Sequence, residues 1–303
     1  MALEELHRWV GDGDEFTARH WRQAPAVLRP EPAPVSPMTL ADVDAALAGG
    51  LLRTPHVEMA RAEQPIPVEA YTAVRTVNGL TTPGFADPGK IRALLDQGAT
   101  LLLRNTEQWH RATAELVGRI ARDTERQVEA FVFVTPPGAQ GLPLHRDDAD
   151  VLLLQIAGSK RWSVHGGPDG GGWAPGPAAQ SGPALLETTL RQGQVLYIPR
   201  GFAHAAVGDE GLSCHLSLTI REVGSQQLYR TLQHLLLDGL TLPARPLTEA
   251  DLLDNSARLL AHFATRLDAI DPRHLLTAAR RHQHRPADPT TAPGLVALAA
   301  ALE

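Results

Sequence analysis

The chain has 303 residues, a formal net charge of −6 and a single cysteine, Cys214. This length allows one large domain or two moderate ones. The acidic balance gives no overall attraction to nucleic acid, so no direct nucleic-acid partner is expected, although a local basic patch would still allow one. A lone cysteine excludes an intramolecular disulfide and favours a reducing compartment. Because the N-terminus lacks the apolar core of a signal peptide and no segment approaches the roughly 20 apolar residues that span a bilayer, we expect a soluble, cytoplasmic protein with no membrane contact.

The first 130 residues have the pattern of mixed helices and short strands. "MTLADVDAALAGGLL" predicts a helix that is capped by Thr39 and ends near a Gly-Gly pair. "DPGKIRALLDQG" predicts a second helix with Asp87 as its cap, Pro88 at its first position and Gly98 after its end. "ATLLLRN" then predicts a short strand, and "TEQWHRATAELVGRIARDT" an amphipathic helix.

Between about 130 and 222 the pattern changes to strands. Short apolar or alternating runs are separated by Gly and Pro turns: "EAFVFVTPPG", "DVLLLQIAG", "RWSVHG", "GQVLYIPRG" and "LSCHLSLTI". That spacing is typical of an antiparallel sandwich or barrel. We therefore predict an α+β protein with a mainly β core, in which residues 1–222 form one domain.

Helices return from Ser225, so residues 223–303 are predicted to form a separate helical region. "LTEADLLDNSARLLAHFATRLDAI" begins with a capping-box-like Thr248-x-x-Asp251. One stripe of this helix is apolar: Leu252, Leu259, Leu260, Phe263, Leu267 and Ile270. A face this broad must pack either on the β core or on a second copy of the chain.

A candidate metal site lies in "GLPLHRDDADVLLLQIAGSKRW", residues 141–162, where His145 and Asp147 precede an apolar run. Side chains two apart on a strand point to the same face, and "GQVLYIPRGFAH" supplies His204 from another strand. Two imidazoles and one carboxylate leave coordination positions open, as in the facial triad of non-haem Fe(II) oxygenases that react with O2. Among 13 histidines, a chance His-x-Asp pair is the alternative.

Lys160 follows a Gly158-Ser159 turn, which we expect to bring the next strand back along the first and to place the lysine beside the metal. There it would pair with a carboxylate of a bound acid; the alternative is an exposed lysine at a strand end, although Trp162 and Val164 favour burial. "SCHLSLTI" alternates, so its polar face should line a wet cavity. That face consists of Ser213, His215, Ser217 and Thr219. The loop "GGPDGGGWAPGP" lacks the ending of a phosphate-binding loop and is interpreted as a flexible surface loop or lid.

Taken together, "VTPPGAQGLPLHRDDADVLLLQIAGSKRW", "GQVLYIPRGFAH" and "SCHLSLTI" resemble the JmjC/cupin-4 family, in particular the ribosomal oxygenases, which are Fe(II)- and 2-oxoglutarate-dependent protein hydroxylases. The upstream "EFTARHWRQAPAVLRP" and "ATLLLRNTEQW" extend the resemblance over roughly residues 15–222. It implies a double-stranded β-helix of the cupin or jelly-roll type. By position, it implies that iron is bound by His145, Asp147 and His204, and the distal carboxylate of 2-oxoglutarate by Lys160. Further hydrogen-bonding candidates are Ser213, Ser217 and Thr219.

Two features depart from the family pattern. Many relatives have an Asn fourteen residues before the first iron ligand, where it helps to hold the co-substrate; this chain has Phe131. The family's C-terminal part has a helical dimerisation region and then a winged-helix-like module, but after the helices expected at 226–282 only "RPADPTTAPGLVALAAALE" remains. The resemblance therefore implies a homodimer, while a ribosomal protein as substrate stays an open question.

The leading hypothesis is a hydroxylase that uses Fe(II), 2-oxoglutarate and O2 to act on a side chain of a protein or peptide. One alternative is a tailoring hydroxylase for a small natural product, another small metabolite or a short peptide. Another is a catalytically silent cupin that binds a ligand or partner.

Overall fold

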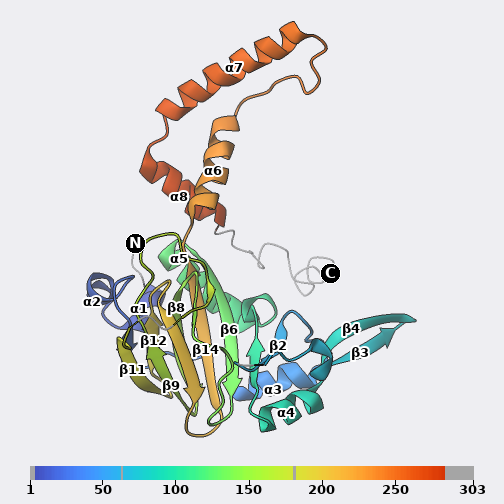
Figure 1. The fold of residues 1–303 in the computed structure, drawn as a ribbon, viewed down its shortest axis with the longest axis vertical. Helices are drawn as coiled ribbons and strands as arrows, with labels where there is room; N and C mark the ends of the chain where they lie inside the picture. The colour runs from blue at the N-terminus through green and yellow to red at the C-terminus, as the bar shows by residue number, and fades with distance from the viewer. Residues whose placement is uncertain (1–3, 63, 180–181, 284–303) are drawn as a thin grey trace, which may run out of the picture. The chain divides into compact units, whose positions relative to one another are not determined.

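The computed structural model describes residues 4–62, 64–179 and 182–283, and the chain divides into two compact units, Met1–Glu222 and Val223–Glu303 (Figure 1). The segment "RPADPTTAPGLVALAAALE" lies outside the described residues. Among these residues, no helix combines the length and the apolar content that a membrane span requires.

The first unit contains two larger antiparallel sheets, which confirms the predicted double-stranded β-helix with a mainly β core. The seven-stranded sheet has the order β1 (Ala26–Leu28), β12 (Val195–Ile198), β8 (Asp150–Ala157), β14 (Ser213–Arg221), β6 (Gln127–Thr135), β5 (Thr100–Leu103) and β2 (Val57–Ala60). The five-stranded sheet has the order β10 (Gly176–Pro177), β7 (His145–Arg146), β13 (Ala203–Gly208), β9 (Ser159–Val164) and β11 (Leu186–Arg191). A separate hairpin consists of β3 (Thr72–Val77) and β4 (Leu80–Ala86).

Strand β8 of the seven-stranded sheet is buried on both faces, because it carries apolar residues at successive positions. In β8, Leu152 and Leu154 belong to a core shared with the N-terminal helices, whereas Val151 and Leu153 belong to a smaller core between the two sheets. The helices and 3-10 turns of this unit are α1 (Glu4–Val10), α2 (Gly13–Arg19), α3 (Leu40–Ala48), η1 (Val68–Ala70), α4 (Pro88–Asp96), η2 (Thr106–Gln108) and α5 (Arg111–Thr124).

Strand β14 differs from β8, because its residues alternate between an apolar face and a polar face. Cys214, Leu216, Leu218 and Ile220 join the core on the helix side. Its polar residues therefore point toward the space between the sheets, as the period of two predicts. This face contributes to the cavity described below.

Helix starts in this unit follow the predicted local signals. The side chain of Thr39 accepts a hydrogen bond from the amide of Asp42 and forms a full capping box for α3. Asp87 caps α4 through the amide of Lys90, with Pro88 at the first helical position. These predictions are confirmed because capping depends on residues within one turn of each other.

The stretch from 141 to 162 differs from the single strand and return turn that we expected. His145 lies on β7 of the five-stranded sheet, and the apolar run that follows forms β8 of the other sheet. Strand β9 does not pair back onto β8, since both edges of β8 are already hydrogen-bonded to β12 and β14. Gly158, with a φ of +58°, turns the chain into the five-stranded sheet instead. The chain thus crosses between the sheets on both sides of β8.

The second unit contains α6 (Ser225–Leu237), α7 (Glu249–Asp268) and α8 (Pro272–Gln283). The capping box of Thr248 and Asp251 at the start of α7 is confirmed. No residue of α7 is buried, and Leu252, Leu260 and Leu267 of its apolar stripe are 54%, 69% and 49% exposed. The other stripe residues, Leu259, Phe263 and Ile270, are half-buried, so the described chain covers this stripe only in part.

Candidate active site

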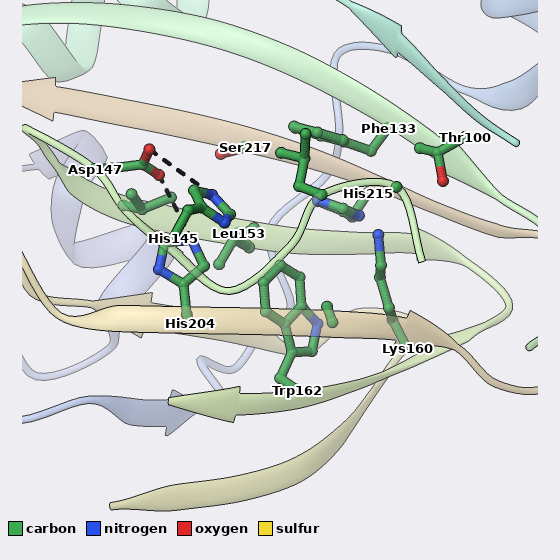
Figure 2. Close-up of a pocket in the computed structure, with 14 residues that line it drawn as sticks. Thr100, Phe133, His145, Asp147, Leu153, Lys160, Trp162, His204, His215 and Ser217 are labelled. Carbon is green, nitrogen blue, oxygen red and sulfur yellow. Dashed lines mark ion pairs between the residues drawn. The ribbon is translucent and has the colours of Figure 1, made fainter. Parts of the chain in front are cut away.

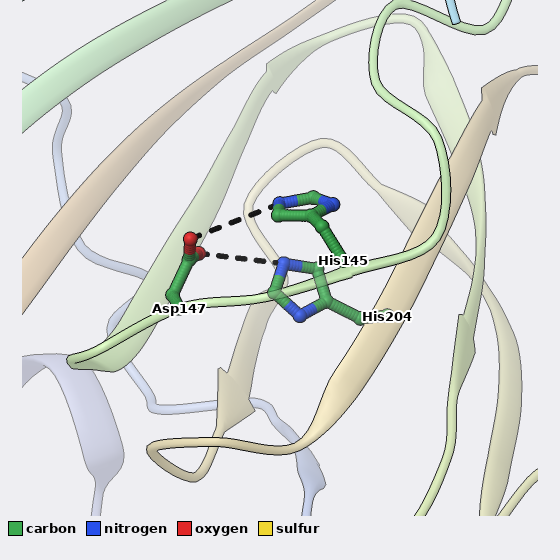
Figure 3. A group of neighbouring side chains, drawn as sticks. All are labelled: His145, Asp147 and His204. Carbon is green, nitrogen blue, oxygen red and sulfur yellow. Dashed lines mark ion pairs between the residues drawn. The ribbon is translucent and has the colours of Figure 1, made fainter. Parts of the chain in front are cut away.

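His145, Asp147 and His204 meet at one end of the space between the sheets (Figure 3). His145 and His204 are register partners on the neighbouring strands β7 and β13, and Asp147 follows β7 directly. Their nearest ligand atoms all lie within 4.8 Å of one another. Nε2 of His145 is 3.9 Å from Oδ1 of Asp147, and Nε2 of His204 is 3.5 Å from Oδ2. The three side chains therefore converge on a single point.

Both imidazoles are held in the orientation that a metal ligand needs. Nδ1 of His145 is 2.8 Å from the carbonyl oxygen of Pro143, and Nδ1 of His204 is 3.1 Å from that of Phe202. A carbonyl only accepts, so each Nδ1 carries the proton and each Nε2 presents a lone pair toward Asp147. Burial, reinforced by His145, lowers the pKa of His204 to about 4, which keeps this imidazole neutral near pH 7.

This donor set fits a divalent first-row metal. Two neutral imidazole nitrogens and one carboxylate oxygen are the protein ligands of the facial triad that binds non-haem iron. Among the residues that the structure describes, no other group of three or more His, Cys, Asp or Glu side chains converges in this way.

The triad borders a cavity between the two sheets, with an empty volume of about 480 Å³ that includes its opening (Figure 2). Strands of both sheets line it. The lining side chains besides the triad include Thr100, Phe133, Leu153, Lys160, Trp162, His215 and Ser217. Figure 2 shows the triad at one end and Lys160 with Thr100 at the other. The cavity thus has the His-Asp-His triad at one end and a lysine at the other.

Lys160 is 4% exposed, so it is not a lysine at a solvated strand end. Its Nζ donates a hydrogen bond of 3.0 Å to Oγ1 of Thr135, which also accepts one of 3.2 Å from Thr100. Nζ lies 5.7 Å from the ring centroid of Phe133 and 5.6 Å from that of Trp162. Burial lowers the pKa of Lys160 from 10.5 to about 7. Among the described residues, no Asp or Glu forms an ion pair with it, so the buried amine lacks an anionic partner.

The other predicted hydrogen-bonding residues lie on β14, and only one of them lines the cavity. Ser217 does so, between the triad and Lys160. Ser213 is fully buried and accepts a hydrogen bond from Nε2 of Gln155. Thr219 makes long contacts to Glu129. Phe131 pairs with Ser217 across the strands but does not belong to the cavity lining.

The structure adds cavity residues that the sequence did not single out as ligands. His215 is on the polar face of β14, and only the alternation of this strand predicted that it would face the cavity. Trp162 is two residues beyond Lys160 on β9 and therefore shares its face. Thr100 comes from β5, and no local sequence pattern predicted its place in the cavity.

Part of the chain, including the donor set, matches a known family. A family model described as the JmjC domain matches residues 106–228, which include the triad and Lys160. This part of the chain is therefore similar to a JmjC domain, and its fold is cupin-like.

Its relatives include oxygenases. It is 28% identical over 214 residues to ribosomal oxygenase 1 of Gallus gallus, covering 67% of this chain and 34% of that protein. It is 29% identical over 147 residues to the bifunctional lysine-specific demethylase and histidyl-hydroxylase NO66 of Dictyostelium discoideum, covering 46% of this chain and 29% of that protein. The chain thus spans about a third or less of the length of these curated relatives.

A solved structure shares the fold. The ribosomal oxygenase YcfD of Escherichia coli, in complex with cobalt and 2-oxoglutarate, superposes with a TM-score of 0.55 at 20% identity, covering 87% of this chain and 68% of that one. At this identity the likeness establishes the fold.

Proposed function

We propose that the protein is an Fe(II)- and 2-oxoglutarate-dependent hydroxylase. One observation carries this proposal: a preformed His-Asp-His group and a buried lysine without an anionic partner occupy opposite ends of the same cavity. A dicarboxylate that contacts the metal at one end and Lys160 at the other would satisfy both. The 2-oxoglutarate bound by YcfD is consistent with this assignment.

In this proposal each part of the cavity has a distinct task. His145, Asp147 and His204 bind the metal and leave its remaining positions open toward the cavity. Lys160 binds the distal carboxylate of 2-oxoglutarate, and the apolar walls, among them Val151 and Leu153, exclude bulk water. When bound, iron and 2-oxoglutarate supply the oxidation by which one oxygen atom of O2 enters an unactivated C–H bond while the other leaves in succinate, with release of carbon dioxide.

The substrate proposed is a side chain of a protein or peptide, with a ribosomal protein as the first candidate because of the relatives' names. The surface next to the site supports a polymeric substrate. A second, more open hollow of about 960 Å³ shares Gly141 and Leu142 with the metal cavity. It extends along the edge strand β2 and is lined by Met59, Ile66 and Tyr71 among others. A groove that continues from the metal site suits residues flanking the one that reacts.

Assembly as a homodimer through the second unit is also proposed, and the exposed part of the apolar stripe of α7, which includes Leu252, Leu260 and Leu267, supports it. Two such helices would bury what one leaves exposed. A reducing, cytoplasmic location fits the single buried cysteine.

The decisive experiment measures succinate formation from 2-oxoglutarate with Fe(II) and O2, with and without candidate peptides. Turnover that depends on Fe(II) and is lost in Asp147→Ala would support the proposal. No turnover and no binding of 2-oxoglutarate to the metal-loaded protein would favour a silent cupin. A mass gain of one oxygen on a peptide, rather than on a small metabolite, would identify the substrate class.

A further inference from the structure

The strands that carry the two histidine ligands are joined by a very short ladder. Strand β7 consists of His145 and Arg146 alone, and it has two register pairs with β13, in which Ala203 faces Arg146 and His204 faces His145. On its other side β7 pairs with β10, which is equally short. Strand pairs of this length contain few backbone hydrogen bonds. Further contacts must therefore help to hold the metal ligands in place.

The side chain of Arg146 supplies two such contacts. Successive side chains of a strand face opposite sides, and Arg146 is not among the described residues that line the cavity, so its guanidinium lies on the side of β7 away from the site. Its Nη1 donates hydrogen bonds to the carbonyl oxygens of Gly201, at 2.5 Å, and of Gly166, at 2.8 Å. Gly201 lies in the turn before β13, and Gly166 lies after the end of β9. One side chain thus connects three segments of the five-stranded sheet.

The turn that Arg146 holds at Gly201 is also the turn that orients His204. The carbonyl oxygen of Phe202, the next residue, is 3.1 Å from Nδ1 of His204 and accepts its proton. The amide of Gly201 donates to the backbone carbonyl of Asp147 at 3.0 Å. The turn is therefore bonded to the backbone of one metal ligand, to the ring of another, and to the side chain of Arg146 on β7.

The hydrogen bond to Gly166 fastens the start of the Gly-rich loop to the same turn. Gly201 has a φ of +82°, and a Cβ atom at this position would lie 3.0 Å from Cδ of Pro168 and 3.1 Å from Cζ2 of Trp173. The loop and the turn are thus packed so closely that a side chain at Gly201 would force one of them to move. The two carbonyl groups that accept from Arg146 belong to one packed unit, which this side chain attaches to β7.

We propose that Arg146 is a positioning residue for the metal site. Its guanidinium holds the turn before β13 against β7, so that the imidazole of His204 meets the other two ligands in a geometry that binds a divalent metal. This inference rests on the proposed function and concerns a side chain that does not itself contact the metal. Outer groups that orient metal ligands typically contribute about ten- to a hundredfold to metal affinity. The competing explanation is a purely structural role, in which Arg146 stabilises the loop and leaves the metal site unaffected.

The test measures Co(II) binding to the metal-free protein, without 2-oxoglutarate or O2. Arg146→Met removes the donors and keeps an unbranched side chain, whereas Arg146→Lys keeps the charge and a nitrogen that can donate to two carbonyls. Calorimetry gives the dissociation constant of Co(II), and the visible absorption of the bound ion reports the geometry of its ligands. Arg161→Met is the matched control, because Arg161 is an exposed arginine of β9 in the same sheet and pairs with Asp209.

We expect Arg146→Met to weaken Co(II) binding about ten- to a hundredfold and to change the visible spectrum of the bound ion. Arg146→Lys should recover most of the affinity, and Arg161→Met should match wild type in both measurements. Far-UV circular dichroism checks that each variant is folded. If Arg146→Met does not fold, Arg146→Gln, which loses the charge and part of the reach, is measured in its place under the same criteria.

Wild-type affinity together with a wild-type spectrum in Arg146→Met would overturn the inference and leave the proposed function in place, because the triad would then bind metal without this support. Equal losses in Arg146→Met and Arg161→Met would overturn it too, since the effect would then reflect the stability of the whole sheet. A wild-type protein that binds no Co(II) would overturn both proposals.

Discussion

Among the described side chains that line the cavity, Lys160 is the one lysine or arginine, and Lys160→Ala removes it. Burial lowers the pKa of this lysine from 10.5 to about 7. At about 1.4 kcal/mol per pKa unit, this corresponds to roughly 5 kcal/mol against the charged amine, which a carboxylate partner would offset. Truncating one member of such a buried pair typically costs about 2–5 kcal/mol, or roughly 30- to several-thousand-fold in affinity.

The assay titrates 2-oxoglutarate at saturating Fe(II) and follows succinate, and a parallel titration measures metal binding. We expect a strongly raised 2-oxoglutarate requirement with nearly normal metal affinity, because Lys160 does not contact the triad. Lys160→Arg should retain part of the affinity, since the charge remains while the reach changes. The only other lysine is Lys90, which donates to backbone carbonyls of the N-terminal region, so Lys90→Arg is a matched control. A 2-oxoglutarate requirement in Lys160→Ala within about twofold of wild type would refute the pairing.

Four further predictions follow from the same structure. Asp147→Ala should remove most of the Fe(II) affinity, because it deletes the one anionic ligand; full metal occupancy by elemental analysis would contradict the triad. The lowered pKa of Lys160 means that the neutral amine predominates above about pH 7 in the free protein, so 2-oxoglutarate binding should take up a proton and weaken as pH rises through this value. Calorimetry in buffers of different ionisation enthalpy measures that proton uptake. Binding at pH 8 without proton uptake would contradict the protonation of Lys160 when the carboxylate binds. Leu260→Asp should dissociate the proposed dimer in light scattering, whereas a wild-type monomer at micromolar concentration would exclude the dimer. Asp150→Ala should destabilise the first unit by about 3 kcal/mol in urea unfolding, since it leaves buried Tyr197 Oη without its acceptor and Arg22 with Glu222 in place of two carboxylates; an unchanged midpoint would disprove this role.

Features set by neighbouring residues could be predicted from the sequence. The caps at Thr39, Asp87 and Thr248 depend on one helical turn, and the alternation of β14 depends on a period of two. These local rules are sufficient because the partners lie within a few residues of each other.

Features set by distant pairing could not be predicted in this way. The expected return of β9 along β8 was wrong, because the edges of β8 are occupied by strands far away in sequence. The position of Lys160 against Thr135 depends on how the two sheets face each other. For the same reason, the meeting of His215 with Trp162 becomes visible only in three dimensions.

In β14, the position of a residue in the alternation decides whether its side chain faces the cavity or the helix-side core. One extra residue inserted between His215 and Ser217 would move the side chains on one side of the insertion to the opposite face of the sheet. Leucine side chains would then point into the polar cavity between the sheets, and serine side chains would point into the apolar core on the helix side. Insertion scanning should therefore find this strand among the least tolerant segments of the protein, although it contributes no metal ligand.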